Sequence, residues 1–205
     1  AYADARAEFE RFAKDSGSRG ESARWHLAQI ALNKLRDDPK LAEKLFGELS
    51  KGGRYAEESL YQLARSQMRQ ERYDDALENL NAYAERYPRG RRVQLVYYYR
   101  GWLPYDHREN ERAIKGLKAY IDRYGRRARR STYVYGFLAW AYMREERWEE
   151  AIEVWEDMLP FGNPLVAGKA MYWRAHAHVQ LEQHDEALAS LDQLRDRYPV
   201  SYYGV

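Results

Sequence analysis

Apolar residues recur along this chain at helical spacing, and each run follows a short acidic stretch. In the clearest copy, 146–155, glutamates precede Ala151, and the apolar residues Ile152, Val154 and Trp155 follow it. Related segments surround five other alanines, namely Ala5, Ala42, Ala76, Ala113 and Ala187, so that the steps are 37, 34, 37, 38 and 36 residues. A helical pattern repeated at this period predicts a solenoid, in which each repeat packs on its neighbours.

Each repeat is expected to contain two helices, which we call A and B. The A helix carries a small residue near its centre: Ala28, Ala64, Gly101, Ala139 or Ala175. The B helix carries the recurring alanine, a large apolar residue four positions later and a helix terminator twelve positions later, as Leu80 and Pro88 do after Ala76. Facing small residues let two helix backbones approach, so a leucine at Ala151 should overpack the crossing.

The repeats are expected at 20–53, 54–89, 90–126, 127–164 and 165–200, after a half repeat at 1–19, all within a single domain. Two prolines mark departures from the pattern. Pro104 lies inside an A helix, where proline ends or kinks a helix, so an irregular exit is expected at 103–106. After a longer turn at 35–39, Asp38 is expected to cap the next helix and Pro39 to open it.

This pattern resembles the tetratricopeptide repeat (TPR), whose usual unit has about 34 residues. The resemblance covers the entire chain with about five and a half copies, slightly lengthened in the turns. It implies an all-α, right-handed TPR-like α-solenoid of about five helix-turn-helix repeats.

The resemblance also implies that particular A-helix positions line a concave groove, and here they are rich in aromatic residues. The candidate groove residues are Trp25, Tyr61, Arg65, Tyr98, Trp102, Tyr105, Tyr133, Trp140, Tyr172 and His176. Gly136 interrupts this ladder of rings. Either the rings are core, or several stay exposed and stack on apolar side chains of a peptide or on sugar rings. The run 97–99 of three tyrosines favours some exposure, because successive helical residues point about 100° apart.

The net charge is only +2, which gives no reason to expect nucleic-acid binding. Acidic and basic residues are nevertheless concentrated in different turns. Turns within repeats are acidic and begin the B helices, where carboxylates favour the helix dipole. Turns between repeats are basic, and their two clusters should be adjacent. The arginines either keep this rim soluble or bind carboxylates and phosphates; the candidate anion rim is Arg89, Arg91, Arg92, Arg126, Arg127, Arg129 and Arg130.

No reaction chemistry is visible in this segment, and we expect no catalytic residue, cofactor or metal. The chain has no cysteine, which excludes disulfides and thiolate ligands. His176 and His178, with His184 close by, suggest a metal site. On a helix, however, His176 and His178 point about 200° apart and cannot share one ion. No glycine-rich phosphate loop or nucleophile elbow occurs. No apolar run approaches the roughly 20 residues that span a bilayer.

The last repeat carries a second resemblance. The segments Tyr172-Trp173-Arg174-Ala175 and Tyr198-Pro199-Val200-Ser201-Tyr202-Tyr203-Gly204 resemble the end of the superhelical domain in soluble lytic transglycosylases. This implies a periplasmic protein whose helical region embraces glycan strands while a separate domain cleaves peptidoglycan. That family's Glu-Ser motif is followed by Gly-Leu-Met-Gln, which does not follow Glu21-Ser22 or Glu58-Ser59, so no catalytic residue is carried over. Ser201 is also explained as the N-cap of a further helix.

Two functions are therefore expected. The first is the non-catalytic superhelical region of a periplasmic peptidoglycan lytic transglycosylase, which would make the longer protein an enzyme. The second is a TPR scaffold for protein–protein interaction in cell-envelope assembly or division, with an intracellular adaptor as a further alternative. The segment 1–12 is an amphipathic helix within a repeat, so we expect a piece of a longer chain. A bare terminal repeat would also allow end-to-end self-association.

Overall fold

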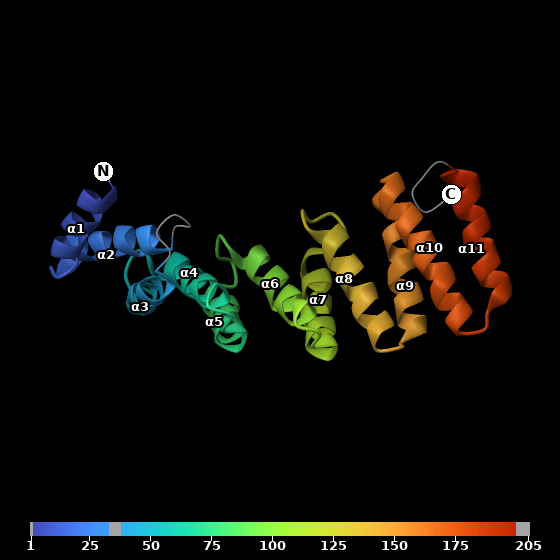
Figure 1. Cartoon of the computed structure of the whole chain (residues 1–205), viewed down its shortest axis with the longest axis horizontal. Coiled ribbons are helices and arrows are strands. Elements are labelled where there is room, and N and C mark those ends of the chain that lie inside the picture. The colour runs from blue at the N-terminus through green and yellow to red at the C-terminus, as the bar shows by residue number, and fades with distance from the viewer. Residues whose placement is uncertain (1, 33–37, 200–205) are drawn as a thin grey trace. The chain divides into compact units, whose positions relative to one another are not determined.

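The computed structural model describes residues 2–32 and 38–199, and within these ranges the chain is helical with no strand. Figure 1 shows the helices in order. They are α1 (Tyr2–Phe12), α2 (Gly17–Ala31), α3 (Pro39–Leu49), α4 (Ala56–Met68), α5 (Tyr73–Arg86), α6 (Val93–Asp106), α7 (Asn110–Tyr124), α8 (Ser131–Arg144), α9 (Trp148–Met158), the short 3-10 helix η1 (Leu159–Phe161), α10 (Pro164–Gln180) and α11 (His184–Arg197). The all-α prediction is confirmed. The even-numbered helices α2 to α10 are A helices, and the odd-numbered ones are B helices.

The chain divides into two compact units, Ala1–Val96 and Tyr97–Val205, which we describe separately. In the first unit α1 packs on α2, α2 on α3, α3 on α4 and α4 on α5. In the second unit α7 packs on α8, α8 on α9, α9 on α10 and α10 on α11. Helix α3 therefore contacts both α2 and α4, and α9 contacts both α8 and α10, as a repeat solenoid requires.

The recurring small residues form the centre of these helix crossings. The alanines at 42, 76, 113 and 151 are completely buried, and so are their A-helix counterparts at 28, 64 and 139. In the second unit one continuous apolar cluster runs from α7 through α8 and α9 to Ala170 of α10. The prediction that small residues mark close crossings is confirmed.

Helices α6 and α7 cross through two glycines. A Cβ on Gly116 would lie 2.4 Å from the carbonyl oxygen of Arg100, and one on Gly101 would lie 2.8 Å from the backbone nitrogen of Leu117. Both distances are shorter than any tolerated contact. Neither position can therefore carry a side chain without moving a helix backbone.

Pro104 lies within α6, which continues to Asp106, so the irregular exit predicted at 103–106 is wrong. Proline withholds the N–H that would otherwise bond the carbonyl four residues earlier. That carbonyl belongs to Arg100 and faces Gly116 of α7 at close range. Since the helix ends two residues after Pro104, the missing bond affects only its last turn.

Four turns between an A and a B helix share one conformation that the sequence pattern did not reveal. A residue other than glycine adopts a positive φ of 55° to 60° in each of these four, namely Glu71, Arg108, Glu146 and Glu182. The turn between α2 and α3 includes residues outside the described ranges. The N–H of the following residue bonds the carbonyl five positions earlier, as Arg147 does to Tyr142 at 3.0 Å. This is the bond pattern of a Schellman motif, in which glycine usually takes the left-handed position.

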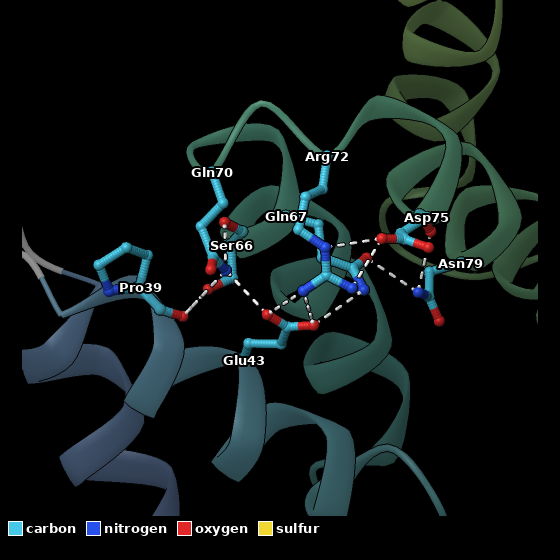
Figure 2. Close-up of polar contacts among 8 residues, drawn as sticks. All are labelled: Pro39, Glu43, Ser66, Gln67, Gln70, Arg72, Asp75 and Asn79. Atoms are coloured by element: carbon cyan, nitrogen blue, oxygen red, sulfur yellow. Dashed lines mark hydrogen bonds and ion pairs between the residues drawn. The ribbon is translucent and has the colours of Figure 1, made fainter.

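Polar side chains tie α3 to the α4–α5 hairpin in the first unit (Figure 2). The Glu43 carboxylate accepts from Arg72 Nη1 at 2.7 Å and from Gln70 Nε2 at 2.8 Å. Ser66 Oγ donates to the Pro39 carbonyl at 2.8 Å. These bonds join residues far apart in sequence and satisfy the charged and polar groups that the packing encloses.

The predicted start of α3 is confirmed. The Asp38 side chain accepts a hydrogen bond from the Leu41 N–H at 3.1 Å, and Pro39 stands at the first helical position. An acceptor at the cap satisfies one of the free N–H groups of the first turn, and proline has no N–H to leave unpaired there. Residues 35–37 of the predicted turn lie outside the described residues.

Replacing Glu146 by glycine should stabilise the protein by about 0.5–1 kcal/mol, because glycine relieves the steric cost of a left-handed residue. The matched control is Glu145→Gly, where φ is −93° and no such cost exists. Urea denaturation of both variants measures the change. A lower midpoint for Glu146→Gly than for Glu145→Gly would contradict the assignment.

Enlarging the crossing alanine in Ala151→Leu should destabilise the protein by about 1–3 kcal/mol, because the buried site has no room for an isobutyl group. Ala82 lies exposed on α5. Its change to leucine should alter stability by less than about 0.5 kcal/mol. Equal effects of the two substitutions on the urea midpoint would show that the crossing at Ala151 is not tight.

Candidate ligand-binding site

A cavity of about 800 Å³ opens in the second unit between α8 and α10. The end of α9 and η1 close one wall, and the last turn of α6 contributes Tyr105. Five of its twelve lining residues are aromatic: Tyr105, Tyr133, Phe137, Trp140 and Phe161. The volume lies within the range of about 300–1,000 Å³ that is typical of ligand pockets.

Gly136 of α8 accounts for the open space. It stands where the corresponding A helices carry Trp25, Tyr61, Tyr98 or Tyr172. A Cβ built on Gly136 would meet only the Met158 Cε atom, at 3.9 Å. The cavity therefore lies where a fifth ring of the ladder would project.

The surrounding rings are held by one another. Trp140 packs edge-on against Trp173 of α10, with ring centroids 4.5 Å apart, and against Trp155 of α9 at 6.2 Å. Tyr105 lies 4.7 Å from Phe137, and burial raises the pKa of its hydroxyl. Aromatic pairs in such geometries attract each other beyond their buried area. The walls are thus formed before any ligand arrives.

Lys169 of α10 is the charged residue of the lining. Its ammonium lies 6.0 Å from the centre of the Trp140 ring and 5.8 Å from that of Trp155. It makes no hydrogen bond or ion pair with any residue that the structure describes, and burial lowers its pKa. A half-buried cation over two ring faces keeps unused capacity for an acceptor group on a ligand.

Three of the predicted groove residues, Tyr105, Tyr133 and Trp140, line this cavity, and Tyr133 is 64% exposed at its rim. Tyr98 and Trp102 instead stack on each other at 6.4 Å, away from the lining. Tyr172 and His176 are exposed on α10 and also lie outside the lining. None of the tyrosines 97–99 is fully buried.

The groove residues of the first unit take separate places. Tyr61 is buried, with the Arg92 guanidinium 5.5 Å from its ring centre, and is core. Trp25 stacks on Tyr55 at 4.8 Å. Arg65 is exposed and donates to the Gln62 side chain at 2.9 Å. That these residues bind a ligand stays a prediction.

The arginines of the predicted anion rim differ in their contacts and in their exposure. Arg92 makes two hydrogen bonds of 2.9 Å to the Glu58 carboxylate, so its guanidinium is already engaged. Arg130 lies 4.8 Å from the Tyr98 ring centre, and Arg126 lies 3.9 Å from Asp157. The exposed members are Arg89, Arg91, Arg126, Arg127 and Arg129. The two clusters belong to different units, and anion binding by either stays a prediction.

The histidines have local contacts. His178 Nδ1 lies 2.7 Å from the Gln183 side-chain oxygen, and His176 packs beside Trp173 at 5.4 Å. Within 2–32 and 38–199, no group of three or more metal-ligating side chains gathers. In the same ranges no helix combines the length and apolar character needed to cross a membrane.

A sequence model of the YfiO family, described as outer membrane lipoprotein, matches residues 53–204. The chain belongs to the YfiO family. This match runs through α4 to α11 and includes the aromatic cavity. No curated protein matches the chain. The description of the family is consistent with a location in the cell envelope.

Solved structures with the same fold support the repeat architecture. MamA from Desulfovibrio magneticus RS-1 superposes with a TM-score of 0.63 at 16% identity over 88% of this chain and 96% of its own. MamA AMB-1 superposes with a TM-score of 0.65 at 16% identity, over 89% of this chain and 93% of its own. BtubC from P. vanneervenii superposes with a TM-score of 0.59 at 17% identity, over 95% of this chain and 87% of its own. At these identities the likeness shows the fold alone, and it confirms the TPR-like solenoid.

The resemblance to lytic transglycosylases finds no support in these comparisons. Of its motif, Val200 to Gly204 lie outside the described residues. The remaining part has a structural explanation, because buried Arg174 of α10 donates to Ser190 Oγ of α11 at 3.0 Å and to Gln193 at 3.2 Å. A residue that ties two helices of one repeat together would recur in many repeat proteins.

Sequence reasoning missed much of the cavity lining, chiefly Phe161 of η1 and Leu165, Val166 and Lys169 of α10. Phe161, Leu165 and Val166 belong to η1 or to the first turn of α10, where the repeat pattern assigns no groove position. Lys169 stands three residues before Tyr172, as Tyr133 does before Gly136, so the pattern does assign it a groove position, although it was not among the candidates. The signal that could have located the cavity was the gap at Gly136.

Because the space beside Gly136 is open, Gly136→Ala should stabilise the protein by about 0.5–1 kcal/mol through the better helix propensity of alanine. Gly116→Ala is the opposite case in the same unit, since its Cβ would meet the Arg100 carbonyl, and it should destabilise the protein. Thermal unfolding followed by circular dichroism separates them. Destabilisation by both substitutions would show that Gly136 is packed rather than open.

Proposed function

We propose that this chain is a TPR-type protein-binding scaffold of the cell envelope, and that its second unit receives a large apolar side chain of a partner peptide. The observation that carries the proposal is the aromatic cavity beside Gly136. The YfiO family match and the TPR-like fold support an envelope scaffold. The periplasmic location expected from the sequence belongs to this proposal.

The chemistry of the walls favours a peptide side chain over a glycan. A sugar ring presents hydroxyl groups on its edge, and burying them without partners costs free energy. The lining side chains of Phe137, Met158, Phe161, Leu165 and Val166 cannot bond a hydroxyl, and the Asn163 side chain already accepts from the Leu165 N–H at 2.9 Å. An aromatic or branched aliphatic side chain needs no such partners and gains from leaving water.

Lys169 adds a polar contact beside this apolar anchor. Its ammonium can donate to a backbone carbonyl or a carboxylate of the bound peptide. In an apolar pocket, a small number of polar groups at the edge is enough to fix the orientation of a ligand. The site therefore combines an apolar anchor with one donor.

A phage-displayed library of random peptides, selected on the immobilised chain, tests the proposal. Selected peptides should share a large apolar residue. Gly136→Leu should weaken their binding at least tenfold, because the new side chain fills the cavity. Gly47→Leu is the matched control, since Gly47 is a helical glycine of α3 whose Cβ also meets open space, and it should leave affinity unchanged.

Binding of the selected peptides that survives Gly136→Leu would contradict this use of the cavity. A second arm measures pull-down on purified peptidoglycan sacculi. Binding to sacculi that is lost in Gly136→Leu, with no peptide enriched, would replace the peptide by a glycan strand and restore the lytic-transglycosylase interpretation.

A further inference from the structure

The aromatic cavity of the second unit is positively charged. The twelve described residues that line it include Lys169 but no aspartate or glutamate. Helix α9 helps to close the cavity, yet two of its carboxylates have arginine partners. Glu156 Oε1 lies 3.5 Å from Arg174 Nη1, and Asp157 Oδ1 lies 3.9 Å from Arg126 Nη1. Because complementary charges guide recognition, this lining favours an anionic group on the ligand.

Arg174, on the same helix as Lys169, shows how this protein accommodates a buried cation. Burial lowers the pKa of both side chains. The Arg174 guanidinium has acceptors, since it donates to Ser190 Oγ at 3.0 Å and to Gln193 Oε1 at 3.2 Å. The Glu156 carboxylate also faces it and opposes the fall in its pKa. Lys169 has no such acceptor among the described residues.

Two tryptophans hold the Lys169 ammonium in place. Its Nζ atom lies 6.0 Å from the centre of the Trp140 ring and 5.8 Å from that of Trp155. Trp155 is fully buried, and Trp140 packs edge-on against Trp173. A donor that is already positioned loses little conformational entropy when a ligand binds. Lys169 is therefore prepared to bind a group that enters the cavity.

A carboxylate compensates this ammonium better than other acceptors do. A hydrogen bond between charged groups is roughly twice as strong as one between neutral groups, and the attraction between charges grows as water is excluded. A backbone carbonyl supplies only a dipole. A phosphate carries more than one charge and three acceptor oxygens, which one ammonium cannot match. One half-buried ammonium thus matches one carboxylate.

We propose that the partner peptide carries an aspartate or glutamate within two positions of its apolar anchor, and that Lys169 binds the carboxylate of this side chain. The inference rests on the proposed function, because the anchor in the cavity brings the acidic residue to Lys169. In an extended segment, side chains two positions apart lie on the same side, about 6–7 Å from each other. The cavity volume of about 800 Å³ is near the upper end of the range for ligand pockets, which leaves room for both groups.

Parallel phage-display selections on the wild-type chain and on Lys169→Met test the inference. The random peptides are fused to the phage coat protein through their C-terminal ends, so every peptide carboxylate belongs to a side chain. The wild-type pool should be enriched, relative to the unselected library, in aspartate or glutamate within two positions of the shared apolar residue. The Lys169→Met pool should keep the apolar residue and lose this enrichment. Lys115→Met removes a charge at an exposed position of α7 and should leave the enrichment unchanged.

A synthetic peptide measures the same contact. The most frequent wild-type sequence, acetylated and amidated, is titrated against each chain by isothermal titration calorimetry. Replacing its acidic residue by the corresponding amide should weaken binding to the wild type roughly tenfold, the loss expected for one charge-assisted hydrogen bond. The same replacement should weaken binding to Lys169→Met by less than about twofold. Methionine retains the apolar stem of lysine, and a cooperative thermal transition shows that the variant is folded.

The selections separate failure of this inference from failure of the proposed function. A wild-type pool with a shared apolar residue but no acidic enrichment would overturn the inference and leave the proposed function standing. Acidic enrichment that persists in the Lys169→Met pool would also overturn it, because another cation would then bind the carboxylate. A wild-type pool without a shared apolar residue would contradict the proposed function, and this inference with it.

Discussion

Close approach of consecutive helices at small residues is the constraint on which this structure depends. A buried alanine such as Ala151 or Ala139 leaves no side chain between two helix axes, and at Gly116 even a Cβ would collide with the neighbouring backbone. Once the crossings are fixed, a large residue four positions after a B-helix alanine, such as Trp155, lies between two A helices. The same constraint therefore determines which apolar side chains are core.

Glycine has opposite effects in two helices of the second unit. At Gly116 its missing side chain is needed for packing, since α6 passes directly over it, whereas at Gly136 the space beside the backbone is empty. A ring at Gly136 would continue the aromatic ladder and fill the cavity. A binding site can thus arise in a repeat protein by the loss of one side chain, with the surrounding rings already held by the repeat packing.

The sequence was sufficient to predict the helix pairs, the crossing alanines and the Asp38 cap, because each depends on residues within one repeat. It failed where several elements combine. Pro104 stays within α6, whose last turn it occupies, and the Arg100 carbonyl that proline leaves without its helical donor faces Gly116 of α7. Tyr61 is core, and Tyr133 is exposed, although both belong to the same predicted groove. Lys169 enters the cavity from a neighbouring repeat, which the pattern of one repeat does not describe. The left-handed Glu146 gave no compositional signal, since glycine is the usual residue there.

The charged side chains of this structure differ in how completely neighbouring residues satisfy them. In the first unit Glu43 and Arg72 bond each other and their neighbours, and such a closed network has no capacity left for a ligand. Arg174 is likewise bonded within its repeat. Lys169 differs because its half-buried ammonium has ring faces beside it and no acceptor among the described residues. A buried cation without an acceptor is a cost to the isolated protein. A ligand that supplies an acceptor removes this cost, so the cavity is the place where binding and stability should be coupled.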